Sequence, residues 1–386
     1  MEDIKLFLIC GGMSILNTLF AGVKIRDGHD NFFTPLRLIF ASLVVIGHAY
    51  VVVLGSSSDE PQVFYHYTFS YIAVNMFFIA SGFLVTKSML YRGDSASFIS
   101  ARALRIYPAL IVHMLFVMLL VGPFVTNLPL KEFFSHPDWY LQPLKVLTFL
   151  DTDMALPGIF STNSEQIGSG ALWTLRYEFL AYIGTWLLFL IGGLRHKWMI
   201  AAQFILPCIA WVVCHQFGLF EHLPATIEAL GRFGIAYGLG AMLYAYREEI
   251  SFHVIMVPIF ALACWLVHSY VPVLEIVMNL MLAWGVMIAA YMKAPKLEWT
   301  QKLSDVSYGI YIYHWAVLQS LFYFFPSLTV WPLIIICYAI TLVLSHASWR
   351  IIEKPTLRLK GPTAKLLQGL MNGLGLGRKK TAYPKP

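Results

Sequence analysis

Long apolar stretches alternate with short polar segments along most of the chain. Each stretch holds roughly 17 to 22 residues, enough to cross a bilayer as an α-helix. The ten stretches lie at 36–54, 69–90, 107–126, 171–193, 199–218, 231–246, 252–270, 273–292, 308–326 and 330–349. The pattern predicts an all-α, polytopic membrane protein with about ten transmembrane helices.

Composition supports this class. Of the 386 residues, 58% are hydrophobic and 12% are charged, and the mean hydropathy is +0.68, which excludes an ordinary soluble domain. The five cysteines include no Cys-x-x-Cys pair, so neither a disulfide framework nor a thiolate metal site is indicated. We expect no metal and no nucleic acid partner, because the net charge of +6 follows membrane topology instead.

The basic residues are divided unevenly between the two sides of the predicted helices. If the first stretch runs outward from Arg37, the outward segments hold only Lys131, Lys145, Arg176 and Arg232. The other lysines and arginines from Lys24 onward fall on the opposite side. By the positive-inside bias, the end of the molecule at Arg37 and the C-terminus are cytoplasmic.

Three regions follow from these patterns. Residues 1–30 are an apolar extension whose stretch at 4–22 is interpreted as a surface helix, a spanning helix or, against its acidic start, a signal peptide. Residues 31–357 hold the transmembrane domain, and 358–386 are a short basic cytoplasmic tail. The longest connection, about 127–170, is expected outside, where it could cover an outward opening.

His48 lies eleven residues after Arg37 in an otherwise apolar stretch. A helix would place the two side chains roughly 20° apart around its axis and roughly 16 Å apart along it. An ionisable group at membrane depth usually lines a cavity or meets a partner. The spacing predicts a channel into a central cavity, with a cation at its mouth and a general base or transient nucleophile at its floor. The alternative is a core histidine bonded to a carbonyl or hydroxyl group.

Arg102 and Arg105 are three residues apart before the third stretch, so they share a helix face. One interpretation is a pair of anchors for lipid headgroups. The other is a phosphate clamp that Arg37 joins, because guanidinium groups bind phosphate bidentately. Glu178 opens the fourth stretch, about 10 Å below the outer end. It would pair with Arg176 or Arg232, or orient an acceptor hydroxyl or His48.

Further polar groups lie at membrane depth. Asn75 and Ser81 belong to one stretch, where a Ser-Gly pair at 81–82 also suits close helix packing. Tyr308, Tyr311 and His314 recur every three residues along one helix face, as packing residues or as a cavity lining. We keep these five residues as candidates for the cavity or the acceptor.

Six motifs in order resemble the membrane-bound acyltransferase 3 family, which O-acylates bacterial surface glycans. They are Arg37-x10-His48, Phe77-Phe78-Ile-Ala-Ser81-Gly82-Phe83-Leu84, Arg102-x-x-Arg105-Ile-Tyr-Pro108, Leu172-Trp173-Thr-Leu-x-x-Glu178, Ser307-Tyr308-x-x-Tyr311-x-x-His314 and Ile352-Glu353-Lys354-Pro355. Each motif alone is unspecific, whereas the six together are specific and cover most of the chain.

The resemblance implies ten spans in the bacterial inner membrane and transfer from cytoplasmic acyl-CoA, such as acetyl-CoA, to a sugar hydroxyl on the outer side. Acyl-CoA would be a co-substrate, with no bound cofactor. It also implies that His48 is catalytic and that Arg37, Arg102 and Arg105 are needed for activity, as ligands of the CoA phosphates. Many members carry a C-terminal SGNH hydrolase-like domain that this sequence lacks. Delivery to the glycan acceptor would therefore be direct or use a separate periplasmic acyl-handling protein.

Together these features predict an enzyme with His48 and Glu178 as catalytic residues. His48 would deprotonate the sugar hydroxyl or carry the acyl group itself, and Glu178 would approach from the outer side. The alternative is a proton-coupled transporter or flippase of a glycan or anionic metabolite, whose mark would be repeated halves with paired broken helices. We see no such repeat.

Overall fold

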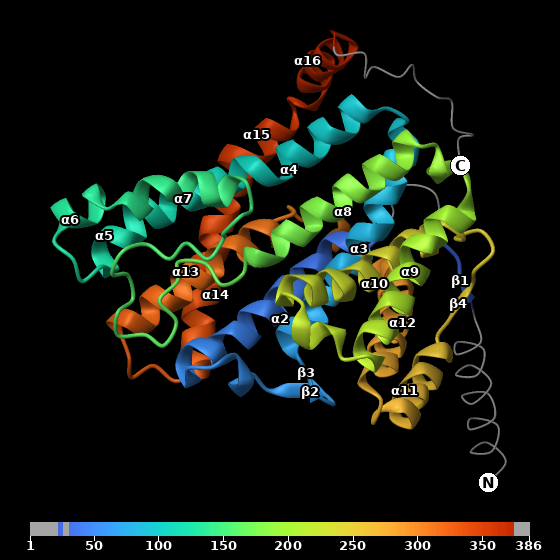
Figure 1. The fold of residues 1–386 in the computed structure, drawn as a ribbon, viewed down its shortest axis with the longest axis horizontal. Coiled ribbons are helices and arrows are strands. Elements are labelled where there is room, and N and C mark those ends of the chain that lie inside the picture. Colours follow the sequence, from blue (N-terminus) through green and yellow to red (C-terminus); the bar gives the residue numbers. More distant parts are fainter. Residues whose placement is uncertain (1–21, 26–30, 374–386) are drawn as a thin grey trace.

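The computed structural model describes residues 22–25 and 31–373. Helices dominate these residues, so the prediction of a helical protein is confirmed (Figure 1). The predicted extension at 1–30 lies outside the described residues except for 22–25, and so does the end of the predicted tail, from 374 onward.

A helix overlaps each of the ten apolar stretches. These helices are α2 (Phe33–Leu54), α3 (Phe69–Arg92), α4 (Ser95–Leu115) continuing into α5 (Gly122–Val125), α8 (Trp173–Leu190), α9 (Lys197–Gln216), α10 (Ala225–Ala245), α11 (Met256–Val267), α12 (Val271–Tyr291), α13 (Ser307–Phe324) and α14 (Val330–Ser348). Within the described residues, six helical segments are long and apolar enough to span a membrane: α2, α3, Ser95–Val125, α9, α12 and Val330–Leu357. The others are too short or carry charged and polar side chains, so the count of about ten stays a prediction.

Shorter elements connect these helices. Helices α6 (Leu130–Ser135) and α7 (Pro137–Leu147) belong to the long connection before α8, and they lie together at one end of the molecule in Figure 1. After α14 come α15 (Lys354–Leu357) and α16 (Lys360–Gly373). Two small antiparallel pairs join β1 (Gly22–Val23) to β4 (Phe252–His253) and β2 (Gln62–Phe64) to β3 (Tyr67–Thr68). Single π-helical turns occur at Phe116–Val121 and Trp349–Glu353.

The turn between α3 and α4 places two of the candidate arginines. Gly93, with φ +65°, ends α3 in the left-handed conformation that glycine adopts without strain. Asp94 then begins α4, where its carboxylate accepts a hydrogen bond of 2.7 Å from the backbone N–H of Ser97. Helix α4 thus starts twelve residues before the predicted stretch at 107–126, and Arg102 and Arg105 lie inside it.

Close packing fixes the wall of the molecule formed by α3 and α10. A Cβ atom at Gly82 would collide with the carbonyl oxygen of Tyr237, and one at Gly240 would collide with that of Ile79. The two backbones therefore meet directly, which only glycine allows at such a crossing. In the pair at 81–82, Gly82 packs against α10, whereas the neighbouring Ser81 lines a cavity.

Candidate active site

A cavity of about 130 Å³ lies between α2, α3, α4, α8 and α13. All three candidate arginines line it, and so does Glu178. The other polar side chains that line it are Ser81, Thr174, Tyr182, Ser307, Tyr308 and Tyr311. The structure thus brings together residues that lie as far apart in the sequence as Arg37 and Tyr311.

Asp305, which sequence reasoning missed, joins two of these arginines. Its Oδ2 atom accepts hydrogen bonds of 2.6 Å from Arg37 and 2.7 Å from Arg105, and the hydroxyl of Ser307 donates to Oδ1 at 2.7 Å. Burial alone would raise the pKa of the Asp305 carboxyl, but Arg105, Arg37 and Ser307 outweigh it and lower the pKa to about 2. The carboxylate therefore stays ionised at neutral pH.

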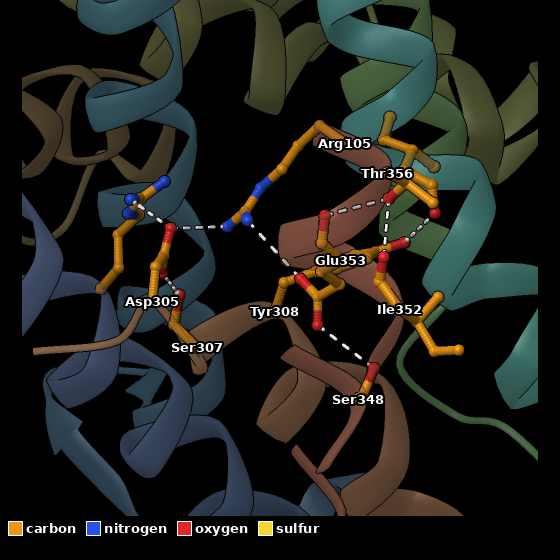
Figure 2. Close-up of polar contacts among 10 residues, drawn as sticks. Arg105, Asp305, Ser307, Tyr308, Ser348, Ile352, Glu353 and Thr356 are labelled. Carbon is orange, nitrogen blue, oxygen red and sulfur yellow. Dashed lines mark hydrogen bonds and ion pairs between the residues drawn. The ribbon is translucent and has the colours of Figure 1, made fainter. Parts of the chain in front are cut away.

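Arg105 lies between two carboxylates (Figure 2). Its second terminal nitrogen is 3.5 Å from Glu353, whose side chain is only 3% exposed and accepts a hydrogen bond from Ser348. The guanidinium also lies 5.6 Å from the ring centre of Tyr308. The motif around Glu353, which alone resembles a helix exit, therefore supports the arginine cavity.

Arg102 differs from its two neighbours. Its guanidinium lies 5.5 Å from the ring centre of Tyr182. Its buried Nε atom, like that of Arg37, has no hydrogen-bond partner among the described residues. The hydroxyl of Tyr182 donates to Glu178. Arg102 therefore meets an aromatic face and not a carboxylate, and its charge is the least neutralised of the three.

Glu178 does not pair with either expected arginine. Arg176 donates to the carbonyl groups of Phe149 and Leu150, and Arg232 donates to Asn75. Glu178 lines the same cavity as the three arginines of the candidate clamp.

His48 forms a pair with His314 on α13. The Nδ1 atom of His48 is 2.8 Å from Nε2 of His314, and the ring of Trp315 packs nearly perpendicular to the His48 ring with centroids 5.0 Å apart. Neither histidine is among the residues that line the arginine cavity. Tyr311, which lines it, has its ring centre 6.2 Å from that of His314. The histidine pair thus lies one layer of side chains beyond the cavity.

Asn75 belongs to a second polar network between α3, α10 and α12. Its amide group donates to the buried carboxylate of Glu275 at 3.1 Å, which also accepts from Tyr71 and Asn279. Arg232 completes the network through the carbonyl oxygen of Asn75 at 3.1 Å. Asn75 is therefore satisfied within the helix bundle and does not line the arginine cavity.

Comparison with known proteins adds to this picture. The model of a protein family described as an acyltransferase domain matches residues 31–350. The chain is 27% identical to an O-acetyl transferase of Shigella phage Sf6, over 87% of this chain and 99% of that protein. It is 28% identical to nodulation protein 10 of Rhizobium leguminosarum bv. viciae, over 86% of this chain and 95% of that protein. No solved structure matches the chain.

Proposed function

Because the chain belongs to the membrane-bound acyltransferase 3 family, we propose that it transfers an acetyl group from cytoplasmic acyl-CoA to a hydroxyl of a surface polysaccharide or lipid-linked glycan. The name of the phage relative, an O-acetyl transferase, supports O-acetylation. The observation that carries the proposal is the convergence of three guanidinium groups on one cavity. The arginine end of the molecule faces the cytoplasm in this proposal, as the distribution of basic residues predicts.

The cavity suits the anionic end of CoA. Asp305 and Glu353 lie against Arg37 and Arg105, whereas Arg102 has no carboxylate partner among the described residues. Guanidinium groups form directional, charge-assisted hydrogen bonds with phosphate. Arg102 is accordingly the first contact for a CoA phosphate. Glu178 acts on this donor side, because Tyr182 donates a hydrogen bond to its carboxylate while the ring of Tyr182 packs against the guanidinium group of Arg102.

The acyl end of the donor then extends along α2 toward His48. The helix is continuous from Phe33 to Leu54, so Arg37 and His48 are roughly 16 Å apart along its axis. That length is comparable to the pantetheine arm. Since Tyr311 lies between the cavity and the histidine pair, the side chain of Tyr311 turns aside when the donor binds.

The chemical step is a direct transfer. His48 removes the proton of the acceptor hydroxyl while the hydroxyl oxygen forms a bond to the thioester carbonyl carbon. The bond between that carbon and the sulfur then breaks. His48 returns the proton to the sulfur, and CoA leaves as the free thiol. The acylated glycan leaves on the outer side; in the alternative route, a separate periplasmic acyl-handling protein delivers the acyl group to the glycan.

The test compares cells with and without this protein. Mass spectrometry of their surface polysaccharide should show an acetyl ester only where the protein is present. The His48→Ala protein should be inserted in the membrane, but the polysaccharide of cells that carry it should lack the acetyl ester. In nanodiscs, purified protein should transfer label from radiolabelled acetyl-CoA to polysaccharide extracted from the deletion cells. Identical polysaccharide in both strains, together with no transfer in nanodiscs, would refute the proposal. Transport of unlabelled glycan across vesicles would favour a transporter instead.

A further inference from the structure

We infer that His314 is a positioning residue that fixes the tautomer of His48 and leaves Nε2 of His48 as its basic atom. This inference rests on the proposed function, in which His48 is the general base. It adds a role for His314 and assigns the proton-accepting nitrogen.

The assignment begins at a backbone carbonyl group. The Nδ1 atom of His314 lies 3.1 Å from the carbonyl oxygen of Ile310, one helical turn earlier. A carbonyl oxygen only accepts hydrogen bonds, so Nδ1 of His314 carries the hydrogen. A neutral imidazole has one N–H group, and therefore Nε2 of His314 is an acceptor.

The same reasoning applies to the ring of His48. Nε2 of His314 is 2.8 Å from Nδ1 of His48, so Nδ1 of His48 carries the hydrogen and donates it. Nε2 of His48 is then left with its lone pair. A protonated His314 would reverse this order, but its side chain is fully buried and no carboxylate contacts either ring in the described part of the chain. A buried charge without a partner is strongly disfavoured.

The surroundings also hold the two rings in place. The two rings meet edge to edge, with centroids 5.0 Å apart and an interplanar angle of 22°, and the ring of Trp315 packs nearly perpendicular to that of His48. His48 keeps part of its surface exposed, whereas His314 has none. His314 therefore cannot meet a substrate in this arrangement, and it acts on the reaction only through His48.

This arrangement also assists the transfer. When Nε2 of His48 accepts the hydroxyl proton, the imidazolium ion still donates from Nδ1 to His314. That hydrogen bond becomes charge-assisted and strengthens as the charge develops. The proton then leaves with the CoA thiolate, and His48 returns to its initial tautomer.

Three substitutions at one position separate this role from simple packing. The amide group of glutamine reaches as far from the backbone as Nε2 of histidine, whereas that of asparagine reaches only as far as Nδ1. His314→Gln therefore keeps an acceptor for His48, while His314→Asn and His314→Leu do not. We expect kcat to fall about 10²- to 10⁴-fold in the latter two, with an unchanged KM for acetyl-CoA, and to recover substantially in His314→Gln.

His113→Leu is the matched control. His113 is a fully buried histidine of α4 whose ring nitrogens have no hydrogen-bond partner among the described residues. Its loss should leave kcat close to that of the wild type. Thermal unfolding of every variant in nanodiscs shows whether a low rate reflects misfolding.

The tautomer itself is read by ¹⁵N NMR of histidine-labelled protein, with the His48 signals assigned by their absence from His48→Ala. The wild type should carry hydrogen on Nδ1 and none on Nε2, and His314→Leu should lose this preference. Hydrogen on Nε2 of His48 in the wild type, or a His314→Leu protein with full kcat, would overturn the inference. If the wild type shows the expected tautomer but transfers no acetyl group, the proposed function fails and the assignment of the tautomer stands.

Discussion

Replacing Asp305 with asparagine removes the carboxylate that Arg37 and Arg105 share. The side chain of Asp305 is 15% exposed, and its Oδ2 atom contacts both guanidinium groups at 2.6 and 2.7 Å. The drop in its pKa from 3.8 to about 2 corresponds to about 2 kcal/mol in favour of the ionised, folded form. We expect Asp305→Asn to lower the free energy of unfolding at pH 7 by about this amount.

The assay is denaturant unfolding of purified protein in detergent micelles. Asp138→Asn is the matched control, because its carboxylate is 50% exposed and lies 4.0 Å from Lys145. Such surface pairs contribute about 0 to 1 kcal/mol. Equal losses in the two variants would refute the reasoning, because the carboxylate shared by two arginines would then stabilise the fold no more than an exposed one.

The pH dependence gives a second check on Asp305. A carboxyl group whose pKa is lowered by folding stabilises the protein above its ordinary pKa, 3.8, and this stabilisation disappears as the pH falls through about 2. The difference in stability between wild type and Asp305→Asn should therefore shrink as the pH falls below 3.8 toward 2. A difference of unchanged size at pH 2 would show that another group is responsible.

Further substitutions have distinct expected results. Arg102→Ala should weaken acetyl-CoA binding, measured by calorimetry, with little loss of stability. Arg105→Ala should reduce both, because Glu353 then loses its cationic partner and Asp305 keeps only Arg37; equal stability of the two variants would contradict this. His48→Ala should bind acetyl-CoA normally but transfer no acetyl group, and retained transfer would exclude its role as base. Gly240→Ala should lower the unfolding midpoint by forcing α3 and α10 apart, while Gly285→Ala, which faces open space, should not.

Helix periodicity predicted part of the site correctly. Arg37 and His48 do lie on one continuous helix, and Arg102 and Arg105 do share the face of α4 that borders the cavity. These relations depend only on the geometry of a single helix, which fixes neighbours three, four or eleven residues apart. The catalytic and binding roles of these residues stay predictions.

Helix periodicity could not predict contacts between segments that are distant in the sequence. Asp305 lies in a connection 268 residues after Arg37, and a single carboxylate in a loop has no repeat that marks its partner. Its place two residues before Ser307, at the start of the Ser-Tyr motif, was the available signal. The depth of Glu178 was inferred from its own helix, whereas the packing of α8 against α3 and α4 decides which cavity it enters. Pairing of His48 with His314 likewise required the docking of α13 on α2.

The position of Arg105 between Asp305 and Glu353 restricts how this protein can diverge. A lysine there carries one compact ammonium group, which cannot replace the planar fork that reaches both acids. A descendant that loses the arginine would leave the buried Glu353 without its cation and Asp305 with Arg37 alone. Among relatives, we expect positions 105, 305 and 353 to covary. Sequences with acidic residues at 305 and 353 but no arginine at 105 should be rare, and a changed residue at 105 should accompany a neutral residue at one of the two acidic positions.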